Sequence, residues 1–116
     1  MQNLLCITFL VICSLNLILS TQWDPSTFGT EVIDDEKVWL VEFYSTMCGG
    51  CIEFNPVWEK IEASMKSVAT TKVNIDDAGG MALAQALNVL DEGIPNVRML
   101  KSKSINPKGE SIVIGN

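Results

Sequence analysis

Short apolar runs recur along this chain and predict strands. The clearest, Val38–Tyr44, is apolar or aromatic throughout except at Glu42, which is typical of a buried strand. Weaker signals predict further strands over Thr70–Ile75, Val97–Leu100 and Ser111–Ile114, and a short opening strand over Thr21–Trp23. Polar stretches over 91–93 and 102–109 predict loops between the later elements.

Other segments carry the period of an amphipathic helix. The first begins with Asp24 as its N-cap. The longest, Cys48–Val68, has apolar residues at helical spacing, namely Phe54, Trp58, Ile61, Met65 and Val68. A third runs over about Gly80–Asn88, with Asp76 or Asp77 as its cap. The order β-α-β-α-β-α-β-β predicts an α/β fold in which helices flank a central mixed β-sheet.

The composition is that of one ordinary globular domain. A length of 116 residues is enough for a single domain, and 47% apolar with 19% charged residues argues against disorder. The formal net charge of −6 makes nucleic acid an unexpected partner, because binding phosphates requires a basic surface.

The first residues predict a secretory signal peptide. Residues 4–19 are almost wholly apolar and uncharged, and this length fits a secretory leader better than a membrane span of about 20 residues. Ser20 is a small residue suited to cleavage, so we expect a signal peptide over 1–20, a folded domain over 21–116 and no stable membrane anchor. The leader lacks Lys and Arg at its start, which leaves an uncleaved anchor as the alternative.

The cysteines beyond the leader form one closely spaced pair. Cys6 and Cys13 lie within the leader, whereas Cys48 and Cys51 belong to a Cys-Gly-Gly-Cys motif at the start of the long helix. Two sulfurs three residues apart on a helix share a face and lie close enough to join, which suits a dithiol that opens and closes. A static structural bridge is the alternative, but so small a loop constrains the unfolded chain little.

A metal site on this pair is disfavoured. Structural zinc takes four nitrogen or sulfur ligands, and the domain offers two thiols and no histidine. Only a dimer that pools two Cys48–Cys51 pairs would supply enough ligands for zinc or an iron–sulfur cluster. We therefore expect redox chemistry without a metal or another cofactor.

Glu42 interrupts the central apolar strand. A carboxylate inside such a run favours a buried functional acid, because charged residues are seldom buried without a role. A place at a strand end or edge, facing water, is the alternative interpretation.

Together these motifs resemble the thioredoxin-like domain of protein disulfide isomerases, of the type that comes first in those proteins. The resemblance runs from about Thr21 to Gly115 and rests, in order, on residues 39–44, the motif at 48–51, Pro56, Trp58 and Ile94-Pro95. It implies a thioredoxin-like fold in which Cys48 attacks a client disulfide and Cys51 resolves the mixed disulfide.

The resemblance also implies roles for residues around the sulfurs. Glu42 is implied to lie buried below them and to relay protons to Cys51. The Ile94–Pro95 bond is implied to be cis, an uncommon form, and to lie where neighbouring backbone pairs with a substrate strand. Met47 is expected either to line the substrate surface or to cap the first turn of the helix.

Some positions depart from that family. Met47 stands where the family commonly has tryptophan, and Gly50 where it commonly has histidine. Without a cationic imidazole, a Cys48 thiolate keeps only the helix N-terminus as a positive partner. We therefore expect a less acidic thiol and a weaker oxidant than the family usually shows.

The end of the sequence departs further. The family fold continues into another helix, whereas this sequence stops at Asn116, so we expect a fragment or a domain in which the C-terminal helix is absent. The helices after Asp24 and Asp77 are expected to share one face of the sheet, with the Cys48–Val68 helix alone on the other. Alternate apolar residues of the last strands are then expected to face that half-empty side and be left bare, among them some of Val97, Met99, Ile112 and Ile114.

Two functions are consistent with these residues. The first is a thiol–disulfide oxidoreductase or isomerase that acts on unfolded or disulfide-containing client proteins in the secretory pathway. It is expected in the endoplasmic reticulum lumen or outside the cell, with a redox partner that oxidises or reduces it. The second is a redox-weak, chaperone-like module that holds clients by apolar surface. The missing histidine favours the second, and the retained Cys48, Cys51, Glu42 and Pro95 favour the first.

Overall fold

The computed structural model describes residues 23–29, 32, 36–101 and 107–113. Its elements are α2 (Pro25–Phe28), β1 (Val38–Tyr44), α3 (Gly49–Ser64), β2 (Ala69–Asn74), α4 (Ala78–Ala86), α5 (Val89–Glu92), β3 (Asn96–Lys101) and β4 (Glu110–Val113). No helix in this part of the chain combines the length and the apolar character that crossing a membrane requires. The predicted signal peptide and most of the predicted opening strand lie outside the described residues.

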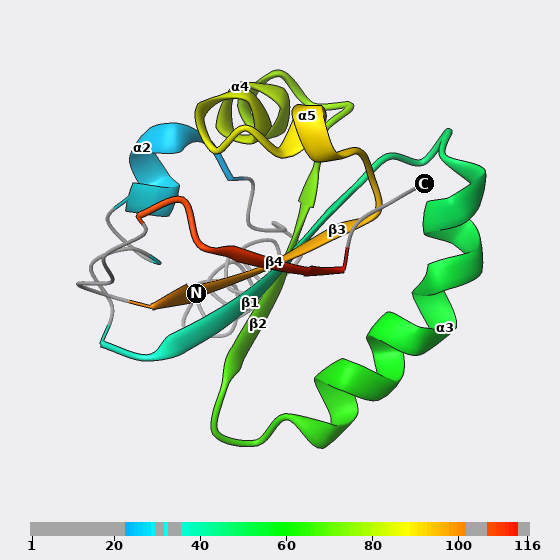
Figure 1. Ribbon diagram of the computed structural model, residues 1–116, viewed down its shortest axis with the longest axis vertical. Coiled ribbons are helices and arrows are strands. Elements are labelled where there is room, and N and C mark those ends of the chain that lie inside the picture. Colours follow the sequence, from blue (N-terminus) through cyan, green and yellow to red (C-terminus); the bar gives the residue numbers. More distant parts are fainter. Residues whose placement is uncertain (1–22, 30–31, 33–35, 102–106, 114–116) are drawn as a thin grey trace, which may run out of the picture.

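The strands form a mixed sheet in the order β2-β1-β3-β4 (Figure 1). β1 pairs in parallel with β2 and antiparallel with β3, which pairs antiparallel with β4. Neighbouring strands thus flank β1, and both its faces are covered, since Leu40, Val41 and Phe43 are buried. A strand covered on both faces needs no polar side, which explains its continuous apolar sequence.

Helices cover the two faces of the sheet unequally. α2, α4 and α5 lie on one face and α3 on the other (Figure 1). The core under the first three helices includes Phe28, Val41, Phe43, Val73, Leu83, Ala84, Val89 and Leu100. The smaller core under α3 consists of Leu40, Trp58 and Val97, with Phe54, Ile61, Val68 and Val113 against it. Within the described residues, the prediction that the long helix lies alone on its face is confirmed.

Asp24 caps α2 as predicted. Its Oδ1 accepts hydrogen bonds from the backbone N–H groups of Ser26 and Thr27, at 2.8 and 2.9 Å. Thr27 Oγ1 in turn accepts from the N–H of Asp24 at 3.1 Å. This reciprocal capping box satisfies N–H groups that a helix start otherwise leaves without partners.

α3 is shorter than the apolar spacing predicts. The helix continues past Pro56 but ends at Ser64, because Met65 has an extended backbone with ψ at 93°. Trp58 is fully buried as predicted, whereas Met65, predicted to be a core residue, is 42% exposed. Val68 still packs on the core, so the apolar spacing persists after the chain has left the helix.

α4 begins without the predicted side-chain cap. Asp77 occupies the N-cap position but its carboxylate makes no capping hydrogen bond. Gly80 lies so close to the end of β2 that a Cβ atom would overlap the carbonyl oxygen of Asn74. Glycine at this position therefore allows the helix to pack directly against the strand.

The predicted loop at 91–93 is largely helical. Asp91 and Glu92 belong to α5, which ends at Gly93 with φ at +88°. A helix of four residues is too short to display a period in its sequence, so the pattern missed it.

The expectation of bare apolar surface on the last strands holds only in part. Val97 is fully buried in the core under α3. Met99 is 37% exposed and Ile112 is 51% exposed, while Ile114 lies outside the described residues. Val97 lies on the α3 face but is covered there with Trp58, so of these residues Met99 and Ile112 are the ones left partly bare.

Candidate active site

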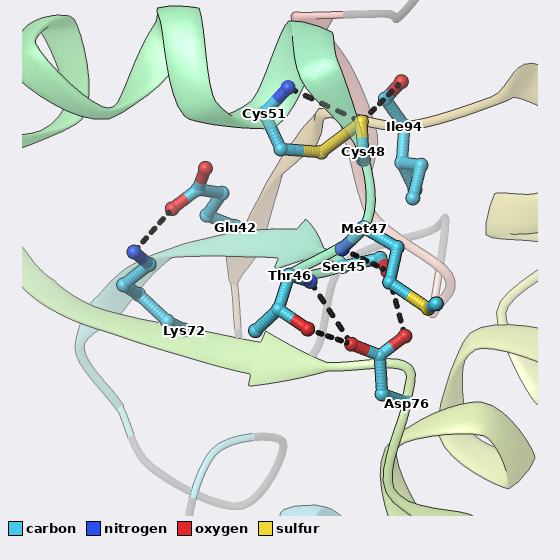
Figure 2. Close-up of a disulfide and its surroundings, with 9 residues drawn as sticks. All are labelled: Glu42, Ser45, Thr46, Met47, Cys48, Cys51, Lys72, Asp76 and Ile94. Carbon is cyan, nitrogen blue, oxygen red and sulfur yellow. Dashed lines mark hydrogen bonds and ion pairs between the residues drawn. A yellow bond between two sulfur atoms is a disulfide. The ribbon is translucent and has the colours of Figure 1, made fainter.

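The two cysteines lie at the start of α3 and form a disulfide (Figure 2). Cys48 is the N-cap of the helix, and its Sγ accepts a hydrogen bond from the backbone N–H of Cys51 at 3.1 Å. Cys51 is 4% exposed, whereas Cys48 is only half-buried. Cys48 is thus the more accessible sulfur, and the helix N-terminus favours a thiolate there after reduction.

The loop before β3 brings Ile94 and Pro95 to the disulfide. The carbonyl oxygen of Ile94 lies 3.8 Å from Cys48 Sγ, and the Ile94–Pro95 peptide bond is cis as the family resemblance implies (Figure 2). A Cβ atom at Gly50 would lie 3.5 Å from Pro95 Cδ, which is ordinary van der Waals contact. Position 50 is also exposed, so a Cβ atom fits there without displacing Pro95.

Met47 extends the exposed surface beside the disulfide. Its side chain is 88% exposed, and that of Ile52, on the other side of the cysteines in sequence, is 64% exposed. So much exposure is at odds with a side chain packed on the first helical turn. The expectation that Met47 caps the first helical turn is therefore disfavoured, and its place on a substrate surface stays a prediction.

Glu42 lies buried on β1, between Cys51 and Lys72 (Figure 2). It is 1% exposed, so the alternative position facing water is wrong. Lys72 stands opposite on β2, with Nζ 3.5 Å from Glu42 Oε2, an oxygen without a hydrogen-bond partner among the described residues. Burial raises the pKa of Glu42, and Lys72 offsets part of this rise.

A cavity of about 280 Å³ joins the buried acid to the second cysteine. It is lined by Glu42, Tyr44, Ser45, Thr46, Cys51, Ile52, Asn55 and Lys72. A volume of this size admits water, and the polar side chains around it supply hydrogen-bond partners. Glu42 and Cys51 therefore line one cavity that is large enough to hold water.

Asp76 fixes the loop that leads to Cys48 (Figure 2). Its carboxylate accepts hydrogen bonds from Ser45 Oγ at 2.6 Å, Thr46 Oγ1 at 2.7 Å and the Thr46 N–H at 2.9 Å. Ser45 Oγ also accepts from the N–H of Met47 at 3.1 Å. The hydrogen bonds from Ser45 and Thr46 hold the pKa of Asp76 below its usual range. The carboxylate thus ties this loop to the end of β2.

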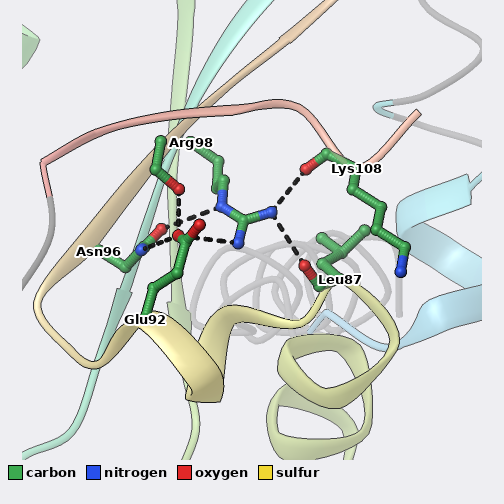
Figure 3. A network of polar contacts seen from close by, with 6 residues as sticks. Leu87, Glu92, Asn96, Arg98 and Lys108 are labelled. Atoms are coloured by element: carbon green, nitrogen blue, oxygen red, sulfur yellow. Dashed lines mark hydrogen bonds and ion pairs between the residues drawn. The ribbon is translucent and has the colours of Figure 1, made fainter. Parts of the chain in front are cut away.

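Arg98, on β3, braces the segment that leads from α5 into β3 (Figure 3). Its guanidinium donates to the carbonyl oxygens of Leu87 and Lys108 at 2.9 and 2.8 Å, and to Glu92 Oε2 at 3.0 Å. Asn96, the residue after Pro95, donates to Glu92 and accepts from Arg98. Arg98 is 3% exposed, and these partners satisfy its buried charge.

The structure brings most of the predicted site residues together and adds others. Cys48, Cys51, Ile94 and Pro95 meet at the start of α3, and Glu42 lines the same cavity as Cys51. Sequence reasoning missed Lys72, Asp76, Asn55 and Arg98. An isolated lysine in the otherwise uncharged β2 was a sequence signal for Lys72. The paired aspartates after β2 were a sequence signal for Asp76.

Comparison with known proteins identifies relatives. The family model named Thioredoxin matches residues 20–112. Human protein disulfide-isomerase A6 is 35% identical over 97 residues, which cover 77% of this chain and 21% of the relative. Protein disulfide isomerase-like 2-3 of Oryza sativa subsp. japonica is 33% identical over 67% of this chain and 17% of its own length. Sulfhydryl oxidase 1 of Cavia porcellus is 28% identical over 81% of this chain and 16% of its own length.

Solved structures share the fold. Oxidised mitochondrial thioredoxin 3 of Saccharomyces cerevisiae superposes with a TM-score of 0.65 at 20% identity, covering 80% of each chain. A thioredoxin of Malassezia sympodialis gives a TM-score of 0.60 at 26% identity, covering 79% of this chain and 74% of its own. The chain spans about a fifth of the length of the curated isomerases that it matches.

Proposed function

The chain belongs to the thioredoxin family, as a domain like those of protein disulfide isomerases, and from this we propose that it exchanges disulfides with client proteins through Cys48 and Cys51. One observation carries the proposal. The disulfide places an accessible sulfur at a helix N-terminus and a buried sulfur on the cavity that contains Glu42.

Each step of the exchange uses a group at this site. In the reduced protein, the Cys48 thiolate attacks one sulfur of a client disulfide, the client S–S bond breaks, and one client thiolate leaves. Cys51 then passes its proton to Glu42 and attacks Cys48 Sγ, which releases the second client thiolate. The client gains two electrons and the Cys48–Cys51 pair loses two. The reverse sequence donates the disulfide to a client dithiol.

The finer assignment, to a protein disulfide isomerase of the secretory pathway, rests on two supports. The apolar leader favours the endoplasmic reticulum lumen or secretion, compartments in which disulfides persist. Similarity to several protein disulfide isomerases favours unfolded or misbridged client proteins as substrates. Isomerisation leaves the redox state of the pair unchanged, whereas each net oxidation or reduction of a client changes it, and a second thiol or disulfide compound must then restore it.

A client-binding module is the second candidate. The exposed side chains of Met47 and Ile52 beside the disulfide favour it, because they offer apolar contact to an unfolded chain. Such a module would suppress aggregation of a client equally well with both cysteines replaced by serine. It would also leave the rate of insulin reduction unchanged.

Insulin reduction separates the two candidates. With dithiothreitol as reductant, we expect the protein to accelerate precipitation of the insulin B chain, and the Cys48→Ser variant to give the uncatalysed rate. Because Cys48 is half-buried and not part of either core, the serine variant is expected to keep its fold, which circular dichroism checks. An unchanged precipitation rate with the folded parent protein would contradict the proposal.

Replacing Glu42 tests its assignment as the proton acceptor. Glu42→Gln keeps the size of the side chain but cannot take a proton from Cys51. We expect release of the client from the mixed disulfide to slow by about 100-fold, the lower end of what a positioned general base contributes, while attack by Cys48 changes little. Stopped-flow measurement of the two steps checks this. Equal slowing of both steps would assign Glu42 another role.

The same variant reports on the burial of the acid through stability. The pKa of Glu42 is raised in the folded state above its usual value, near 4.5. A group of this kind contributes its full stabilisation of the fold below the usual pKa. This contribution to the free energy of unfolding is lost as the pH rises through the raised pKa. The free energy of unfolding should therefore decline above about pH 4.5 more steeply in the parent than in Glu42→Gln. Urea titrations across this range measure the difference, and parallel pH profiles would show that Glu42 is not desolvated.

A further inference from the structure

We propose that Asn55 is a positioning residue for Glu42: it holds the Lys72 ammonium beside the buried acid and thereby sets how readily Glu42 takes a proton from Cys51. The inference rests on the proposed thiol–disulfide exchange and deepens it. Asn55 lies on α3, one helical turn after Cys51, and lines the same cavity as Cys51, Glu42 and Lys72.

The hydrogen bonds of Asn55 fix the direction of its amide. Its Oδ1 accepts from Lys72 Nζ at 3.1 Å, and its Nδ2 donates to Glu59 Oε1 at 3.2 Å. An ammonium group only donates and a carboxylate only accepts, so these partners allow a single orientation of the amide. Glu59, one turn further along α3, thus keeps the carbonyl oxygen of Asn55 aimed at Lys72.

Lys72 depends on Asn55 for its place in the cavity. Its Nζ makes its hydrogen bond to Asn55, lies 4.4 Å from the centre of the Tyr44 ring, and approaches Glu42 Oε2 only to 3.5 Å. The side chain is 33% exposed, so water is within reach as an alternative partner. An ammonium group is strongly hydrated, and without the Asn55 carbonyl it would spend more of its time in solvent, farther from Glu42.

Moving Lys72 changes the charge that Glu42 experiences. Burial raises the pKa of Glu42 most, Lys72 of β2 lowers it, and Glu62 of α3 adds a smaller rise. Asn55 itself carries no charge, so its replacement changes the pKa of Glu42 by moving Lys72 and not by a direct Coulomb interaction. Loss of the Asn55 carbonyl should therefore favour the protonated form of Glu42.

A carboxyl titration by NMR tests this in the oxidised protein, independently of any activity. The Glu42 signal is assigned by its loss in Glu42→Gln. We expect the midpoint of Glu42 to move upward in Asn55→Ala, so that the ratio of ionised to protonated Glu42 falls by about threefold, a part of what an opposite charge within 4–6 Å supplies. Lys72→Met should raise the midpoint at least as far.

The double variant shows whether Asn55 acts through Lys72. In a Lys72→Met background, Asn55→Ala should cause no further shift, because the cation that it positions is already gone. Lys60→Met removes an exposed cation from the same helix and should leave the midpoint unchanged. An equal shift from Asn55→Ala in both backgrounds, a downward shift, or no shift would overturn the inference.

A kinetic readout separates failure of this inference from failure of the proposed function. The pH profile for release of the mixed disulfide should move upward in Asn55→Ala together with the NMR midpoint. If the parent protein exchanges disulfides but Asn55→Ala leaves both the midpoint and the profile in place, only the role of Asn55 is overturned. If the Glu42 midpoint shifts in Asn55→Ala but the parent does not exchange disulfides, the proposed function is overturned. Asn55 then has no role in catalysis, although it still positions Lys72.

Discussion

Replacement of Cys51 by serine is expected to leave Cys48 joined to client proteins in long-lived mixed disulfides. In the parent, the sulfur of Cys51 lies in the same helical turn and attacks Cys48 intramolecularly. Intramolecular attack corresponds to a very high effective concentration of thiol, so its loss should lengthen the lifetime of the mixed disulfide roughly a thousandfold at millimolar external thiol. Non-reducing gels after acid quenching, with the joined peptides identified by mass spectrometry, measure the trapped fraction.

The Cys48→Ser variant is the matched control. Cys51 is 4% exposed and lies under the first helical turn, so without Cys48 it should trap very few clients. Equal trapping by the two serine variants would contradict the assignment of Cys48 as the attacking sulfur. Such a result would mean that the start of α3 opens far enough for clients to reach Cys51.

A histidine at position 50 is expected to make the disulfide a stronger oxidant. An imidazolium beside the Cys48 thiolate stabilises the reduced form, lowers the pKa of that thiol and raises the reduction potential of the pair, by about 30 mV for each tenfold gain in the equilibrium constant. A Cβ atom fits at Gly50, because it meets Pro95 Cδ only at 3.5 Å, and the exposed position lets the rest of the side chain extend into solvent. Equilibration with mixtures of reduced and oxidised glutathione measures the potential.

Gly50→Gln separates the charge from the bulk of the new side chain. It should leave the potential within about 10 mV of the parent, because it supplies no cation. The gain from Gly50→His should also fade as the pH rises above the imidazole pKa, usually about 6.5. A gain of the same size in both variants, or one that persists at pH 9, would show that flexibility of the glycine pair, and not the missing charge, sets the potential.

The layers of the fold could be predicted from the sequence because buried positions are occupied by apolar residues at the spacing of a strand or a helix. β1 has the predicted ends, Val38 and Tyr44, since both of its faces are covered and its apolar run is continuous. Asp24 was identifiable because capping chemistry is local. The end of α3 could not be identified from the sequence, because Val68 keeps the apolar spacing although the helix has ended at Ser64.

The site was predictable where its chemistry lies in neighbouring residues and unpredictable where it depends on distant ones. The cysteine pair and the acid within an apolar strand stand out in the sequence itself. Lys72 meets Glu42 only through the parallel pairing of β2 with β1, and Asn55 meets Lys72 across 17 residues. Asp76 was interpreted as a helix cap because its partners, Ser45 and Thr46, lie about 30 residues earlier. These contacts follow from the packing of α3 and β2 on the sheet, which no local pattern specifies.

The most direct test of the exchange mechanism is a single turnover with reduced protein in excess over insulin. Samples quenched at intervals and labelled with a thiol-specific reagent report, by mass, the state of every cysteine in both molecules. The mechanism predicts that Cys48 loses its free thiol first, in a transient adduct with insulin that frees one insulin thiol, and that Cys51 loses its own as the second insulin thiol appears. Labelling of both Cys48 and Cys51 as free thiols throughout, with insulin still intact, would contradict it.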